Sequence, residues 1–100
     1  MSVILAGTAR FATATLGAAR EQMVEMMRLS RAEDGCIAYS YAEDLTDEGL
    51  VHVFEVWRDQ GALDAHHHAP HFLAWREKRA ELGMSDRNLV AYDASDGRQT

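Results

Sequence analysis

The stretch CIAYSYAEDLTDEGLVHVFEVW, from Cys36 to Trp57, decides the fold that we expect for this chain. Side chains alternate in character at both of its ends, with the two-residue period of a β-strand. The second end is rich in β-branched and aromatic residues, which favour strands. The segment between them, Leu45–Gly49, is typical of a turn. The stretch therefore predicts an antiparallel β-hairpin.

One face of this hairpin combines apolar and aromatic side chains with a carboxylate. We expect Ile37, Tyr39 and Tyr41 to share one face of the first strand. The expected core face of the second strand consists of Val51, Val53, Glu55 and Trp57. A carboxylate in such a layer needs a partner or a polar pocket. Glu55 is therefore a candidate functional residue.

The rest of the chain predicts one domain around this hairpin. The other expected elements are a strand at 2–10, an amphipathic helix at 11–33, a short helix after Asp59, a second helix from Pro70 to Gly83, and a strand at 86–94. Thr13 or Thr15 would cap the first helix, and Gly35 would follow its end with a positive φ. The order is the ferredoxin-like βαββαβ pattern of an α+β fold. We expect a single domain at 1–95 and a tail at 96–100.

Helices on one face of such a sheet leave its other face uncovered. Because the strands carry apolar residues on both faces, a second copy of the chain is the natural cover. A domain of 100 residues also has a thin core, and pairing adds apolar burial. We therefore predict a homodimer.

The composition excludes several classes of function. The net charge is −6, and an acidic surface is a poor partner for nucleic acid or anionic lipid. No apolar run reaches the roughly 18 residues of a membrane-spanning helix, and the N-terminus has no signal-peptide pattern. The one cysteine, Cys36, excludes an intramolecular disulfide, which fits a reducing cytosol. We expect a cytoplasmic protein that binds neither nucleic acid nor membrane.

Residues from Gly35 to Phe72 carry a resemblance to a known family. They form a Gly-Cys-x-x-Tyr strand start, a Glu-x-Trp strand end, a short helix ending in histidine, and a Pro-His-aromatic step into the last helix. These residues are Gly35, Cys36, Tyr39, Glu55, Trp57, Leu63, His66, Pro70, His71 and Phe72. In this combination the chain resembles the antibiotic biosynthesis monooxygenase (ABM) family, and within it the quinol monooxygenases.

The resemblance implies a small dimeric α/β barrel protein. Some family members oxygenate phenols or quinols with O2 and use no metal, flavin or haem, because the substrate anion itself reduces oxygen. Others degrade haem, isomerise small molecules, or have no known activity. Haem-degrading members carry a tryptophan where this chain has His66, and a haem-ligating histidine where it has Arg76 and its neighbours. We therefore expect no haem and no other cofactor.

Four of the five histidines lie between His66 and His71. They suggest a metal site first, since imidazole is a common metal ligand. His67 and His71 have the i, i+4 spacing of a helical pair, but Pro70 breaks a helix between them. No His-Glu-x-x-His pattern is present either. We expect no metal site, and surface positions for His67 and His68.

His66 and His71 are the candidate catalytic residues, because the resemblance falls on both. The N-terminus of a helix lowers the pKa of a nearby histidine, which favours a neutral base. One of the two would take the hydroxyl proton of a phenol or quinol. The alternative is that both only hydrogen-bond across the corner between the helices. The sequence does not say which histidine would be the base.

The candidate substrate-binding residues are Tyr39, Tyr41, Glu55, Trp57, Phe72 and Trp75. Their rings could stack on a flat substrate in an apolar slot beside the helical corner. The alternatives are that the rings are plain core, and that Glu55 pairs with an arginine or with backbone N–H groups.

We therefore expect a cofactor-independent monooxygenase that binds a small aromatic substrate and O2. One alternative is an isomerase or detoxifying enzyme for a small carbonyl compound, which needs no oxygen. Another is a non-catalytic dimeric binding or stress-response module. The sequence does not identify the substrate.

Overall fold

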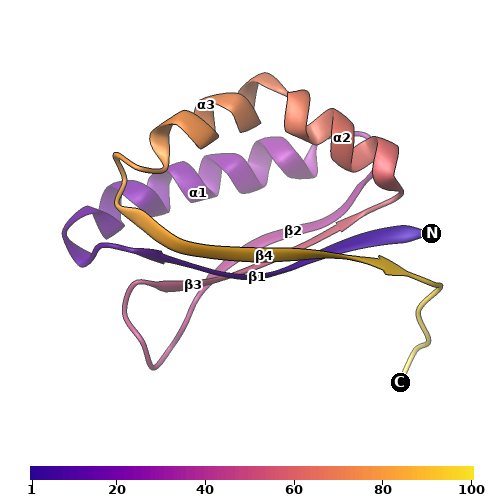
Figure 1. Cartoon of the computed structure of the whole chain (residues 1–100), viewed down its shortest axis with the longest axis horizontal. Helices are drawn as coiled ribbons and strands as arrows, with labels where there is room; N and C mark the ends of the chain where they lie inside the picture. The colour runs from indigo at the N-terminus through magenta and orange to yellow at the C-terminus, as the bar shows by residue number, and fades with distance from the viewer.

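The computed structural model of the chain describes residues 1–100. Its elements are β1 (Ser2–Phe11), the 3-10 helix η1 (Thr13–Thr15), α1 (Leu16–Arg31), β2 (Cys36–Glu43), β3 (Leu50–Trp57), α2 (Gln60–His68), α3 (Pro70–Lys78) and β4 (Met84–Ala94). This order confirms the predicted ferredoxin-like βαββαβ fold. Figure 1 shows the helices in one layer and the strands in the other.

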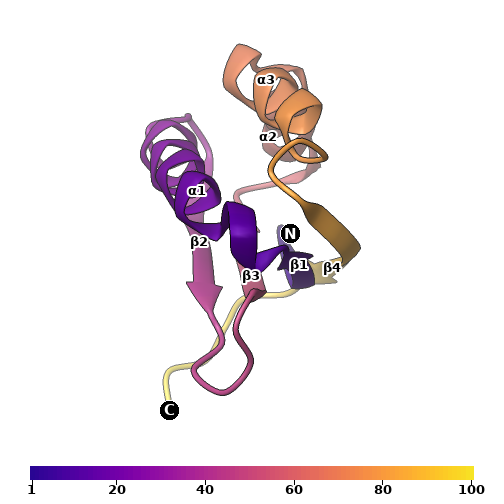
Figure 2. The same cartoon turned by 90° about the vertical axis from the view of Figure 1, so that its left-hand side faces the viewer.

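The four strands form one antiparallel sheet in the order β2-β3-β1-β4. β3 pairs with β2 in the predicted hairpin, and β1 lies between β3 and β4. The helices lie on the same side of the sheet, with α1 against β2 and α2 against β1 and β3 (Figure 1 and Figure 2). The other face of the sheet is open.

The core lies between the sheet and the helices. The predicted core face of β3 is buried, namely Val51, Val53, Glu55 and Trp57. In β2, Tyr39 is buried as expected, but Ile37 is 61% exposed. The pairing register shifts between Cys36 and Ala38, and this β-bulge turns Ile37 away from the core. The prediction that Ile37 shares a face with Tyr39 is therefore wrong.

The first helix packs as its periodicity predicts, but it begins differently. Its buried side chains recur at helical spacing, namely Leu16, Ala19, Met23, Met26 and Ser30. Thr15 occupies the N-cap position, yet its side chain caps nothing. Its hydroxyl instead donates to the carbonyl of Leu82 at 2.6 Å. Thr15 thus ties the start of α1 to the turn before β4.

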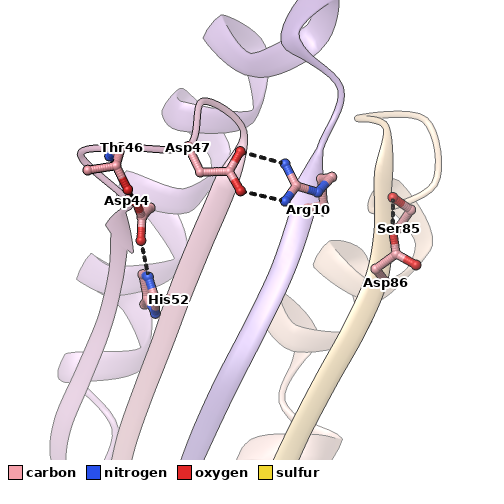
Figure 3. A network of polar contacts seen from close by, with 7 residues as sticks. All are labelled: Arg10, Asp44, Thr46, Asp47, His52, Ser85 and Asp86. Atoms are coloured by element: carbon pink, nitrogen blue, oxygen red, sulfur yellow. Dashed lines mark hydrogen bonds and ion pairs between the residues drawn. The ribbon is translucent and has the colours of Figure 1, made fainter.

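Polar contacts fasten the end of the sheet that carries the β2–β3 turn (Figure 3). Arg10 of β1 donates two hydrogen bonds to Asp47 in the turn, at 3.1 and 2.8 Å. Asp44 accepts two bonds from Thr46, each of 2.8 Å, and lies 2.8 Å from His52. These partners hold the pKa of Asp44 and of Asp47 below their usual values. The candidate site lies at the opposite end of the hairpin, where Cys36 and Trp57 pair.

The open face of the sheet carries exposed apolar side chains. Phe54 is 46% exposed, Val90 43% and Tyr92 55%. Ala6 of β1 pairs with both Phe54 and Val90, so these side chains share one face of neighbouring strands. None of the helices has the length and hydropathy of a membrane span.

Candidate functional site

Two short helices meet at a corner that carries the candidate histidines. The Asp59 side chain caps α2, as predicted, by accepting a backbone hydrogen bond at 2.8 Å. α2 ends because Ala69 is extended, with φ −69° and ψ 142°, and Pro70 then begins α3. This break places the ring of His66, in the last turn of α2, 5.9 Å from the ring of His71, in the first turn of α3.

The loop between α1 and β2 brings a third side chain to this corner. Gly35 has a φ of +87°, and a Cβ there would lie 2.6 Å from the Cβ of Ala62 in α2. Only glycine tolerates both the positive φ and the close approach of Ala62. The Gly35 carbonyl accepts a hydrogen bond of 2.8 Å from the Arg58 N–H, which fastens the loop beside the start of α2. This arrangement positions Glu33, two residues before Gly35, against the corner.

Glu33 joins the two candidate histidines. Its Oε2 lies 2.5 Å from Nδ1 of His66 and 2.8 Å from Nε2 of His71. An ionised carboxylate only accepts, so each ring donates one N–H. The side chains of Glu33 and His71 are 15% and 18% exposed, whereas that of His66 is 1% exposed. The cluster therefore runs from a partly exposed histidine to a buried one.

The buried histidine keeps one free nitrogen. Because Nδ1 of His66 donates to Glu33, Nε2 carries the lone pair of the neutral ring. This Nε2 is buried and has no hydrogen-bond partner. Burial lowers the pKa of His66 and outweighs Glu33, whose hydrogen bond and charge raise it. The neutral form, which can accept a proton, is therefore favoured.

Three aromatic rings surround this imidazole. The ring centroids of Trp57, Phe72 and Tyr39 lie 4.6, 5.0 and 5.4 Å from that of His66. All three belong to the predicted substrate-binding set. Since they come from β3, α3 and β2, the hairpin and the helical corner enclose His66 together.

The other predicted binding residues lie one contact further away. The Tyr41 hydroxyl is 2.9 Å from that of Tyr39, and its ring is 5.9 Å from that of Trp75. Glu55 accepts a hydrogen bond of 2.9 Å from the indole N–H of Trp57, so its partner is neither an arginine nor a backbone N–H. Burial raises the pKa of Glu55, and raises that of Tyr41 to about 12.

His67 and His68 differ from each other. His68 is exposed, as predicted, and its Nδ1 donates to the carbonyl of Asp64 at 2.8 Å. His67 is half-buried, and its ring lies 4.9 Å from that of Phe72. The surface prediction is therefore wrong for His67, because the turn into α3 folds Phe72 back onto it.

The expected open slot beside the corner is not found. The rings of Tyr39, Trp57 and Phe72 pack on His66, and neither of the two cavities in the structure includes His66. One cavity, of about 200 Å³, lies between α1 and the hairpin and includes Tyr41. The other, of about 120 Å³, lies between α1 and α3 and is lined partly by His71 and Trp75. Two candidate residues, His71 and Trp75, therefore share a cavity, but neither cavity joins a candidate residue to His66.

Glu33, His66 and His71 also make a two-histidine, one-carboxylate donor set of a kind that binds iron or zinc. Their donor atoms lie within 4.8 Å of one another. Ligands of an ion bound at about 2.1 Å lie about 3 Å or more apart. The observed 2.5 and 2.8 Å separations are instead those of a carboxylate shared by two imidazole N–H groups. The converging pair is His66 and His71, not the His67 and His71 pair that the spacing suggested.

Glu33 is the site residue that sequence reasoning missed. Its segment, Ala32–Gly35, indicates by itself only the end of a helix. A signal was nevertheless present in the hairpin. Its register pairs Cys36 with Trp57, so residues just before β2 lie beside residues just after β3. A carboxylate at that position lies close to the helix that follows β3.

The antibiotic biosynthesis monooxygenase family model matches residues 3–78. The chain is 47% identical over 63 residues to "Uncharacterized protein sll1783" of Synechocystis, and 40% identical over 65 residues to "Putative monooxygenase Rv0793" of Mycobacterium tuberculosis. These matches span 63% and 65% of this chain, but only 43% and 63% of the two relatives.

The fold is shared with solved structures over nearly its whole length. The structure of Rv0793 matches with a TM-score of 0.88 and 27% identity, covering 99% of this chain and 100% of that one. The crystal structure of a "putative antibiotic biosynthesis monooxygenase" from Deinococcus radiodurans matches with a TM-score of 0.90 and 25% identity, covering 100% and 98%. With more than half of its residues matched by the family model, the chain belongs to the antibiotic biosynthesis monooxygenase family.

Proposed function

We propose that this chain is a monooxygenase that acts on a small phenolic or quinol compound without a metal, flavin or haem. His66 would be the base that takes the hydroxyl proton. The observation that carries the proposal is the buried Nε2 of His66, which has no partner although Glu33 fixes the opposite nitrogen. Membership of the family supports a monooxygenase-like role.

In this mechanism the base generates the reductant. A quinol that loses its proton becomes an anion, which is electron-rich enough to reduce O2. One oxygen atom forms a bond to a ring carbon, and the other leaves as water with two hydrogens of the substrate. Quinol and O2 thus give hydroxyquinone and water, and the substrate supplies all the electrons. The protein would hold the ring, take the proton and exclude water.

Glu33 and His71 would act as positioning residues. When His66 takes a proton it becomes an imidazolium, whose charge Glu33 would stabilise. His71 donates to the same carboxylate oxygen and so restrains its orientation. Because His71 also borders the cavity between α1 and α3, it would connect the buried cluster to the surface.

A substrate can reach Nε2 only if an aromatic ring moves. Of the three rings around His66, Phe72 is 9% exposed, whereas Tyr39 and Trp57 are 2% and 0% exposed. We assign Phe72 as the ring that rotates to admit substrate. The packed space around His66 also favours a second candidate, a non-catalytic dimeric module in which the cluster only fixes the helical corner.

A homodimer is part of the proposal. Phe54, Val90 and Tyr92 leave an apolar patch on the open face of the sheet. A second copy presents the same patch, so a two-fold contact would cover both at once.

Oxygen consumption tests the proposal directly. Chelator-treated protein would be mixed with a panel of phenols and quinols in an oxygen electrode. We expect uptake above the protein-free blank, and at least about 100-fold slower uptake by His66→Gln, since a general base contributes on that scale. The control is His68→Gln, an exposed neighbour on the same helix, which should leave uptake unchanged.

Three results would count against the proposal. No uptake by the wild type on any compound would leave the non-catalytic module as the better account. Turnover that continues without oxygen would favour an isomerase. Uptake that depends on added iron or zinc would show that the cluster of Glu33, His66 and His71 holds a metal.

A further inference from the structure

Some arginines of this chain form ion pairs with carboxylates, and others do not. The arginines that pair with carboxylates are Arg10, Arg20, Arg28 and Arg58. In contrast, the guanidiniums of Arg76, Arg79 and Arg87 form none of the ion pairs or hydrogen bonds in the structure. Because the net charge is −6, the chain has ample carboxylates that could have served them.

These three side chains are here named the arginine cluster. Arg76 and Arg79 lie one turn apart at the end of α3, and Arg87 lies in β4. Burial lowers the pKa of Arg79, and the positive charges of Arg87 and Arg76 lower it further. Like charges held together repel, and a bound anion would relieve that repulsion.

Arg79, the half-buried member of the arginine cluster, lies beside the aromatic corner. Cζ of Arg79 is 6.0 Å from the centroid of the Phe72 ring. Phe72 in turn lies 5.0 Å from the ring of His66 and 4.9 Å from that of His67. One aromatic ring therefore separates Arg79 from the proposed base.

No carboxylate from the strands forms an ion pair with the arginine cluster. No residue of β4 is buried, and Arg87 itself is exposed. The carboxyl of Glu55 is influenced by the charge of Arg87, but it is 4% exposed and already accepts from Trp57. Burial raises the pKa of Glu55, which disfavours its charged form and makes it a weaker counter-ion.

We propose that the arginine cluster binds the carboxylate of an aromatic acid, with the ring of that acid at Phe72 and a ring hydroxyl directed to His66. Guanidinium groups suit this task because they bind carboxylates through two parallel hydrogen bonds. The inference rests on the proposed function for the role of His66. It narrows the substrate class from phenols and quinols in general to hydroxylated aromatic acids.

Equilibrium binding tests the inference independently of turnover. The probes are 3,4-dihydroxybenzoate and its methyl ester, titrated under nitrogen by isothermal titration calorimetry. We expect the wild type to bind the acid at least about tenfold more tightly than the ester, as charge-assisted hydrogen bonds imply. Arg87→Gln and Arg79→Gln should abolish this preference, and raising the salt concentration should weaken it.

The matched control is Arg28→Gln, which removes the same charge from an exposed position on α1. It should keep the preference for the acid. Equal affinity for acid and ester in the wild type would overturn the inference, as would an equal loss of preference in the control. A preference for the acid without oxygen uptake would reject the proposed function alone, whereas uptake with no such preference would reject the inference alone.

Discussion

Nδ1 of His66 lies 2.5 Å from Oε2 of Glu33, although 33 positions separate the two residues in the sequence. This contact decides which nitrogen of the buried ring carries a proton, and therefore which nitrogen can accept one. It also makes the chemistry of a fully buried imidazole depend on a carboxylate in a surface loop. Changing that carboxylate is the most direct way to test the cluster.

Glu33→Gln should slow oxygen uptake by about 10 to 100-fold through kcat, with little change in KM. The amide can no longer stabilise the imidazolium that forms when His66 takes a proton. The hydrogen bond and charge of Glu33 raise the pKa of His66, so their removal should also shift the acidic limb of the pH–rate profile to lower pH.

That shift separates a positioning role from a purely structural one, because a loss of packing alone would lower the rate without moving the profile. The matched control is Asp34→Asn, the exposed neighbour of Glu33 in the same loop. A profile that keeps its acidic limb in Glu33→Gln would contradict the assignment.

The stability of the protein should fall on mild acidification. Burial lowers the pKa of His66 below its ordinary value of 6.5. Below that pH the unfolded chain binds a proton that the folded chain does not, so the free energy of unfolding decreases until the folded pKa is reached. Above pH 6.5 this contribution is complete.

Thermal unfolding between pH 8 and pH 5 would measure this effect. Tm should drop on acidification in the wild type, and should drop less in His66→Gln. Glu33, His67 and His71, which also act on this site, are the same in both proteins. His68→Gln, at an exposed position, should behave like the wild type. Identical pH dependence in His66→Gln and the wild type would show that His66 is not the group responsible.

The order of elements could be predicted because each follows from local patterns. The strand alternation in β3, the Asp59 cap and the break at Pro70 all depend on residues near one another in the chain. Ile37 was misplaced because a β-bulge depends on the pairing with β3, which alternation within one strand does not show.

The site was only partly predictable for a similar reason. The resemblance pointed to His66 and His71 as separate candidates, and their common partner Glu33 comes from a distant loop. A cavity that includes His66 is not found, because the size of a cavity depends on how rings from three elements pack, and composition does not fix that.

Glu55→Gln should stabilise the protein at pH 8 by about 1 kcal/mol. Burial raises the pKa of Glu55 in the folded protein above its ordinary value of 4.5. The contribution of Glu55 to stability is therefore complete below pH 4.5, and it is lost as the pH rises through the pKa of the folded state. Glutamine is neutral at every pH and can still accept from Trp57. The gain should shrink toward pH 4 in urea unfolding, while the exposed Glu81→Gln should show little change at either pH. A less stable Glu55→Gln at pH 8 would contradict this account.

Phe54→Glu should convert a dimer into monomers. Phe54 is 46% exposed on the open sheet face, and a two-fold contact there would bring two new carboxylates together. Light scattering at micromolar concentration would give the mass, and circular dichroism would check the fold. Leu45→Glu is the matched control, since Leu45 is fully exposed in the β2–β3 turn and away from that face. A monomeric wild type, or a Phe54→Glu variant that stays dimeric, would remove the two-fold sheet contact from the proposal.

Gly7→Ala should destabilise the protein by about 1–3 kcal/mol or more, because overpacked sites cost energy on that scale. A Cβ at Gly7 would overlap the backbone carbonyl of Asn88, so β4 would have to move away from β1. Gly17→Ala is the matched control, since a Cβ at this helical position has nothing within 4 Å. Alanine favours helices, so Gly17→Ala should be neutral or stabilising by up to about 1 kcal/mol. Urea unfolding would measure the free energy of unfolding of both variants. If Gly7→Ala were as stable as the wild type, β1 and β4 would not be paired so closely at Gly7.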